Sequence, residues 1–231
     1  LLDQYRVGIT GEIASGKSKV AEDLVAAARK AGLPSVHINV DEILRELYDE
    51  DSVGAHIVRD ELAKRFGAGV LANGGKTVNR PALAAIVFDV AAYADRKFVV
   101  NLTMPHVYRL YRKALAHARG LVVVEWARMA EMSMGAMTNH NVIVVSSPDR
   151  DKFIAARGLD AERVAAMSRL QFTASEKKIL LESAARAARS GDVVAYENRF
   201  RTDLKNPDPA LLHLLDYLIG PVFPGLQSLK K

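Results

Sequence analysis

The 231-residue sequence contains no cysteine, which excludes disulfides, thiolate metal sites and cysteine nucleophiles. It also lacks any apolar run of about 18 residues, the length that a membrane-spanning helix needs, so we expect no membrane partner. What is present is a globular balance of 49% hydrophobic and 26% charged residues. We therefore expect a cytoplasmic protein, present as a monomer or a weak homo-oligomer.

Neither sign of charge dominates, although Lys and Arg number 32 against 27 Asp and Glu, a net charge of +5. Part of the basic excess falls in residues 150–189, which hold nine basic and five acidic side chains. An anionic partner is indicated, and a phosphorylated small molecule is the simplest one. No basic patch interleaved with aromatic residues is visible, so a nucleic-acid-dependent ATPase ranks last among the alternatives.

The first motif reads G-x-x-x-x-G-K-S and follows a short apolar stretch, residues 5–9. In such a loop the glycines let backbone N–H groups converge on phosphates, Lys17 brings a positive charge, and the Ser18 hydroxyl can bind Mg²⁺. The sequence therefore predicts ATP and Mg²⁺ as cofactors. The predicted cofactor-binding residues here are Gly11, Glu12, Ile13, Ala14, Ser15, Gly16, Lys17, Ser18 and Lys19.

The hydrophobic pattern predicts an α/β protein with a five-stranded, doubly wound parallel sheet of the P-loop kinase type. Strands are expected at residues 5–9, 35–40, 120–124, 141–145 and 192–196, with helices between them. We expect one domain, 1–231, with three predicted parts. Its core is residues 1–40, 119–148 and 190–220, its helical substrate-binding insertion is 41–118, and its helical lid is 149–189. Residues 67–78 of the insertion are expected to form a glycine-rich loop.

Several polar residues follow predicted strands, at the sheet edge where α/β proteins bind ligands. Asp41 could accept a proton from a substrate hydroxyl or merely cap the helix that begins there, and the residue alone leaves both open. Glu125 or Glu131 could support Mg²⁺ through water, and a surface role for Glu131 is an equal alternative. Arg157 and Arg169 could close over the ATP phosphates. No role is assigned to five histidines that lack metal-ligand spacing: His37, His56, His117, His140 and His213.

These residues resemble the dephospho-CoA kinase family across nearly the whole chain. The phosphate-binding stretch begins at Val7-Gly8-Ile9-Thr10, and Ile38-Asn39-Val40-Asp41 with Arg45 is similar to the family's second-strand motif. Further matches, in chain order, are Phe66-Gly67, Asn79-Arg80, Asn101-Leu102-Thr103-Met104-Pro105, Arg157-Gly158-Leu159, Gln171, Asp192-Val193-Val194 and Asn198.

The resemblance implies an ATP-dependent enzyme that phosphorylates the ribose 3′-hydroxyl of dephospho-CoA, with a small molecule as its partner. It implies that Asp41, Lys17 and Arg157 are catalytic, that Asn198 joins the cofactor-binding residues, and that Arg45, Arg80, Glu125 and Gln171 bind substrate. Two residues that differ from the family pattern, Met104 and Arg128, are also predicted to bind substrate. The alternatives are a P-loop kinase of another nucleoside, nucleotide or alcohol, and a nucleotide-binding protein without transfer activity.

Several positions depart from the family pattern, among them Glu12 and Lys19 in the phosphate-binding loop. Met104 stands where the family carries histidine, Phe153 replaces the first lid arginine, and Arg128 is an added cation after the third strand. Arg128 could bind a more anionic acceptor, replace the lost histidine or point to solvent. The phosphate-binding residues are kept while the acceptor pocket is changed.

Overall fold

The computed structural model describes residues 4–89, 91–201 and 208–220. The described chain forms two compact units, one from residues 1–39 and 118–231 and the other from Val40–His117. The second unit coincides with the predicted insertion 41–118 to within one residue at each end. Predictions for residues 1–3, 90, 202–207 and 221–231, including part of the predicted core, lie outside the described residues.

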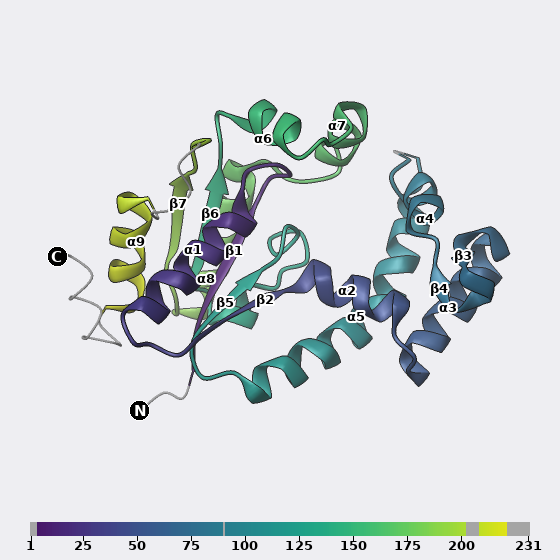
Figure 1. Ribbon diagram of the computed structural model, residues 1–231, viewed down its shortest axis with the longest axis horizontal. Helices are drawn as coiled ribbons and strands as arrows, with labels where there is room; N and C mark the ends of the chain where they lie inside the picture. Colours follow the sequence, from purple (N-terminus) through teal and green to yellow (C-terminus); the bar gives the residue numbers. More distant parts are fainter. Residues whose placement is uncertain (1–3, 90, 202–207, 221–231) are drawn as a thin grey trace. The chain divides into compact units, whose positions relative to one another are not determined.

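The first unit is built on a five-stranded parallel sheet in the order β2-β5-β1-β6-β7, which confirms the predicted fold (Figure 1). β5 is buried throughout and β1 is buried over its last five residues, because both have strand neighbours on both sides and helices on both faces. The carboxyl ends of parallel strands share one edge, so this edge carries the polar residues discussed below. The strands are β1 (Gln4–Gly11), β2 (Ser35–Asn39), β5 (Gly120–Glu125), β6 (Val142–Ser146) and β7 (Val193–Glu197).

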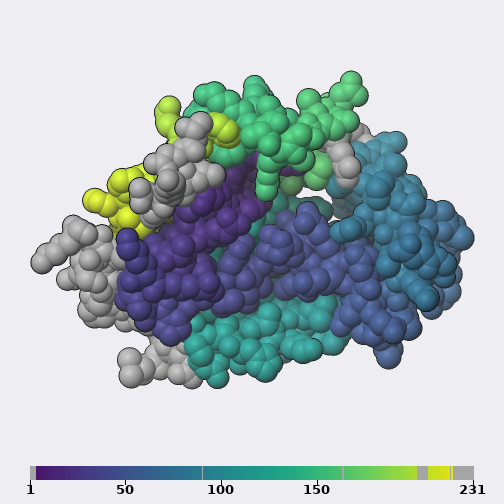
Figure 2. All heavy atoms as spheres, viewed as in Figure 1, coloured from purple at the N-terminus to yellow at the C-terminus, as the bar shows by residue number. Residues whose placement is uncertain are grey.

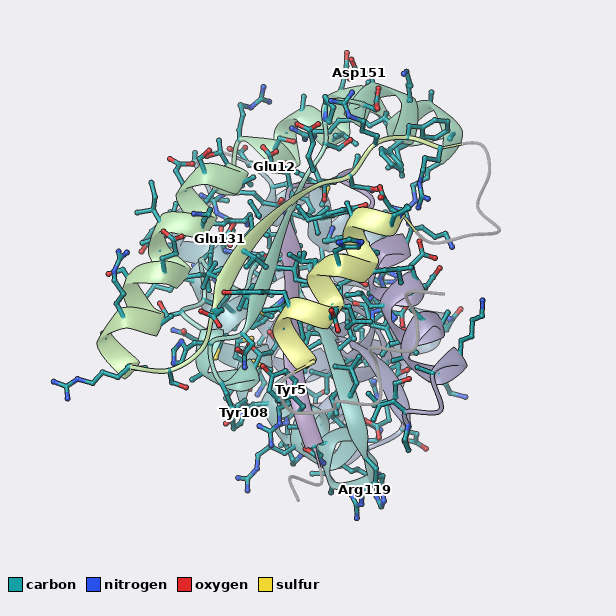
Figure 3. All side chains as sticks on the ribbon, turned by 90° about the vertical axis from the view of Figure 1, so that its left-hand side faces the viewer. Tyr5, Glu12, Tyr108, Arg119, Glu131 and Asp151 are labelled. Carbon is teal, nitrogen blue, oxygen red and sulfur yellow. The ribbon has the colours of Figure 1, made fainter. Side chains whose placement is uncertain are left out.

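Helices cover both faces of this sheet. The α1 (Lys17–Lys30) and α9 (Pro209–Ile219) helices lie on one face, and α8 (Ala174–Ala188) lies on the other (Figure 3). Alternate strand residues face opposite sides, so Val7 and Ile9 join a buried cluster with Leu24 of α1 and Leu211 of α9. Within the described residues, no helix is long and apolar enough to cross a membrane.

The lid predicted over residues 149–189 extends too far along the chain, because its last part is a helix that packs on the sheet. The short helices α6 (Arg150–Ala156) and α7 (Ala161–Ser168) lie at the surface of the first unit (Figure 2). In contrast, α8 packs against β6 and β7, because Leu181 and Ala185 form a buried stripe with the spacing of one helical turn. The α8 part of the predicted lid therefore belongs to the packed first unit, and a lid over residues 149–172 stays a prediction.

The second unit is mainly helical. The α2 (Val40–Asp49) helix packs on α3 (Val53–Phe66) and α5 (Tyr93–His117), and α4 (Arg80–Val87) packs on α5. The expectation of a loop over 67–78 is wrong, since β3 (Leu71–Ala72) and β4 (Thr77–Val78) pair antiparallel there. Two-residue strands are too short to show an alternating pattern in the sequence.

Candidate active site

The loop between β1 and α1 needs glycine at both ends. Gly16 has φ +75°, and a Cβ there would lie 2.2 Å from the Asn198 side-chain nitrogen and 3.0 Å from the Phe153 ring. A Cβ on Gly11 would lie 2.2 Å from the Val145 carbonyl oxygen. These close approaches explain why the motif tolerates only glycine at these two positions.

Two side chains from distant parts of the chain hold carbonyl groups of the loop. The Arg150 Nε donates to the Ile13 oxygen at 3.0 Å, and the Asn198 Nδ2 donates to the Ser15 oxygen at 2.9 Å. In a trans peptide the carbonyl and the next N–H point in opposite directions, so the N–H groups of Ala14 and Gly16 point away from these partners. Together with the N-terminus of α1, this arrangement suits an anion.

The Ser18 hydroxyl is bound by a buried carboxylate at the end of β5. Ser18 Oγ donates to Glu125 Oε1 at 2.7 Å, and the Glu125 side chain is only 2% exposed. The second carboxylate oxygen, Oε2, accepts from Asn39 Nδ2 at 3.1 Å and lies 3.0 Å from His37 Nε2. The sequence pointed to Glu125 and Ser18 but assigned His37 no role, and the structure places His37 in contact with Glu125.

Burial raises the pKa of Glu125, but the hydrogen bonds from His37 and Ser18 and the nearby charge of Lys17 outweigh it. The pKa of Glu125 therefore lies below its usual value and the carboxylate is ionised at neutral pH. An ionised carboxylate only accepts hydrogen bonds, so the Ser18 hydrogen is committed to Glu125 and the Ser18 oxygen keeps its lone pairs for another ligand.

This donor set fits Mg²⁺ held largely by a nucleotide. Magnesium in kinases takes one or two protein oxygens, with phosphates and water as its other ligands. Among the described residues no group of three or more His, Cys, Asp or Glu side chains could hold a metal ion by itself. The Ser18 oxygen is the ligand that this loop would offer, and its role in binding Mg²⁺ stays a prediction.

Comparison with known proteins decides the family. The family model described as dephospho-CoA kinase matches residues 5–186. The chain belongs to the dephospho-CoA kinase family. A dephospho-CoA kinase of Synechococcus sp. (strain CC9605) is 28% identical over 87% of this chain and 93% of its own length. Another, of Syntrophotalea carbinolica, is 29% identical over 88% of this chain and 95% of its own length.

The fold agrees with a solved structure as well. TT1252 from Thermus thermophilus superposes with a TM-score of 0.64 at 27% identity and covers 93% of this chain and 98% of its own. Membership of the dephospho-CoA kinase family confirms the predicted enzyme class, an ATP-dependent phosphotransferase acting on an alcohol group.

Not all the residues predicted for a dephospho-CoA kinase site lie in the first unit. Four of them belong to the second unit, so their place in the site stays a prediction: Asp41, Arg45, Arg80 and Met104. In the first unit Arg157 and Arg169 are exposed, and the Lys19 ammonium pairs with Asp23 at 2.6 Å along α1. Asn198 donates a hydrogen bond to a backbone carbonyl group of the loop and so helps to hold the loop in its conformation.

Arg128 and Gln171 are both half-buried in the first unit. The Arg128 Nε and the Gln171 Oε1 are buried and have no hydrogen-bond partner among the residues that the structure describes. Unpaired buried polar atoms are costly, so a ligand that supplies their partners is favoured. This is consistent with the predicted substrate-binding roles of both residues, which stay predictions. Arg150, in contrast, contacts the loop and was not predicted.

The sequence also gave no sign of a buried ion pair beside this site. Lys177 of α8 is fully buried, contacts Glu131, and donates to the Ala127 oxygen at 2.8 Å. Glu131, on the α8 side of the sheet (Figure 3), also accepts from the Phe172 N–H at 3.0 Å. The surface role considered for Glu131 is therefore wrong. Burial, only partly offset by Glu131, lowers the pKa of Lys177.

We expect Lys177→Met to lower the free energy of unfolding by about 3–5 kcal/mol, because it leaves Glu131 buried without its counter-ion. Urea unfolding followed by circular dichroism measures the change. Lys178→Met is the matched control, since Lys178 pairs with Glu182 at the surface and its loss should cost less than about 1 kcal/mol. Equal effects of the two variants would contradict the assignment.

Proposed function

We propose that this protein transfers the γ-phosphate of ATP to the ribose 3′-hydroxyl of dephospho-CoA in the cytoplasm. Family membership supports the reaction. The observation that carries the proposal in the structure is the Ser18 hydroxyl held by ionised Glu125 at the start of α1, next to Lys17. A loop of this kind binds a nucleotide triphosphate with Mg²⁺, and the metal, when bound, neutralises charge on the phosphates.

The residues take distinct roles in this proposal. Lys17 and the loop N–H groups hold the phosphates, and the Ser18 oxygen is the protein ligand of Mg²⁺. Asp41 accepts the proton of the acceptor hydroxyl and aligns its oxygen. Arg157 approaches the phosphates when residues 149–172 close. Arg128 and Gln171 of the first unit contact the acceptor, and the acceptor residues of the second unit are Arg45, Arg80 and Met104.

The test is to incubate the protein with ATP, Mg²⁺ and dephospho-CoA and to analyse the product by mass spectrometry and by nuclease digestion that locates the new phosphate. We expect a product heavier by one phosphate at the ribose 3′-position. ATP binding without this product would overturn the acceptor assignment. A screen of nucleosides and other alcohols would then follow, because the added cation Arg128 suits a different anionic acceptor.

Replacing Arg128 with alanine should raise the KM for the acceptor about tenfold or more, the effect of losing a hydrogen bond to a charged group. The KM for ATP should not change. Steady-state kinetics with each substrate varied in turn measures both values. Arg186→Ala, which removes an exposed arginine on α8, is the control. An unchanged acceptor KM in Arg128→Ala would mean that this side chain does not bind the acceptor.

A further inference from the structure

We propose that His37 is a positioning residue for the nucleotide site. Its Nε2–H fixes the Glu125 carboxylate, which in turn fixes the direction of the Ser18 hydroxyl. The inference rests on the proposed function, because it takes ATP with Mg²⁺ as the ligand of the loop. The dependence of nucleotide binding on Mg²⁺ should therefore depend on a histidine that touches neither the nucleotide nor the metal.

Strand geometry brings the four residues together. His37 and Asn39 are two apart on β2, so both face the same side of the sheet. Parallel pairing sets Asn39 directly opposite Glu125 of β5 and His37 opposite Val123. That side is the one covered by α1, whose first turn carries Ser18. The contact between His37 and Glu125 is thus fixed by backbone register.

The two oxygens of the Glu125 carboxylate have different hydrogen-bond partners. Glu125 Oε1 receives the Ser18 hydrogen at 2.7 Å, whereas Oε2 receives Asn39 and lies 3.0 Å from His37. An ionised carboxylate cannot donate, so the facing His37 nitrogen must carry a proton. Without this donor the carboxylate can rotate away from Ser18, and this change frees the Ser18 hydrogen to point towards the ligand position.

The contact between His37 and Glu125 is shielded from water. The Glu125 side chain is 2% exposed and that of His37 is 22% exposed, so water does not readily replace a lost donor. Lys17 places a positive charge near the same carboxylate. His56 offers the contrast, because its Nε2 lies 2.7 Å from Asp51 Oδ1 in a pair that is more than half exposed on both sides.

The test compares two amide substitutions. In His37→Gln the side-chain nitrogen reaches the position of Nε2, whereas in His37→Asn it falls short of Glu125. ATP binding to each protein is measured by isothermal titration calorimetry, once with Mg²⁺ and once with EDTA. We expect His37→Asn to bind ATP about tenfold more weakly than wild type with Mg²⁺ and equally well in EDTA, and His37→Gln to bind like wild type in both.

Controls separate this role from a structural one. His56→Asn should match wild type in both buffers. Equal weakening of His37→Asn with Mg²⁺ and EDTA would show a merely structural contact, and wild-type binding by His37→Asn, or a His37→Gln as weak as His37→Asn, would also overturn the inference. If the asparagine variant does not fold, His37→Leu takes its place with the same expectations.

The same experiment distinguishes this inference from the proposed function. Lys17→Ala is titrated beside the histidine variants. If Lys17→Ala loses ATP binding while His37→Asn keeps its Mg²⁺ dependence, the inference fails and the proposed function stands. If wild type and Lys17→Ala bind ATP equally, or neither binds it, the loop is not the nucleotide site and the proposed function itself is wrong.

Discussion

Replacing Lys17 with alanine should lower kcat for phosphoryl transfer by about 10²–10³-fold, the cost of removing one preorganised electrostatic group from a site where charge develops. The side chain begins at the first residue of α1, directly after the left-handed turn at Gly16. Its charge also contributes to holding Glu125 ionised, so the substitution removes a cation that acts on both the phosphates and the carboxylate.

Initial rates of ADP formation with saturating ATP and dephospho-CoA measure this change. Lys30→Ala is the matched control, because Lys30 lies on the same helix, is exposed, and sits in its last turn. Circular dichroism of both variants checks that α1 is intact. Transfer by Lys17→Ala at the wild-type rate would place the reaction elsewhere in the protein.

The positions of the sheet strands along the chain could be predicted because each strand carries its own local signal. Residues 120–124 are all apolar, and β5 indeed lies between two neighbours and is buried along its length. The loop from Gly11 to Ser18 was equally clear, since its chemistry depends on residues adjacent in sequence. Local patterns thus predicted the fold and the position of the loop that is expected to bind phosphate.

The contacts around Glu125 could not be predicted in the same way. Asn39 and Glu125 lie 86 positions apart, and only the pairing register of β2 and β5 makes them neighbours. A lone histidine on a strand has no sequence signature for such a contact. His37 was therefore passed over, although strand alternation could have placed it on the side of Asn39 once the register was known.

The packing of the α8 helix also could not be predicted from the sequence. Lys177 occupies the buried stripe that continues through Leu181 and Ala185, so a charge interrupts the apolar pattern of a helix that packs on the sheet. Its partner Glu131 is in a different part of the chain. The sequence consequently favoured a mobile lid where the structure has a packed helix. The Thr173–Glu176 capping box marks the true boundary, since it starts a new helix there.

Asp41→Asn should reduce phosphoryl transfer by about 10²–10⁴-fold and leave ATP binding nearly unchanged, the expected result if Asp41 is the base for the acceptor hydroxyl. The amide keeps the size of the carboxylate and removes only its ability to accept the proton. The alternative is a local structural role. Because α2 begins at Val40, Asp41 lies inside the first helical turn. A carboxylate there stabilises the helix by only about 0.3–1 kcal/mol, through its interaction with the helix dipole.

Glu42→Gln gives the matched control, since Glu42 is the other acidic residue in the first turn of α2 and is exposed. Both variants lose one negative charge from the same helix end, so a dipole effect should lower their stability similarly. Only Asp41→Asn should lose transfer, measured as single-turnover product formation with ATP and dephospho-CoA. If both variants keep the wild-type rate, Asp41 serves the helix alone. Another group would then have to accept the proton of the acceptor hydroxyl. The other carboxylates of the second unit would be substituted next to find it.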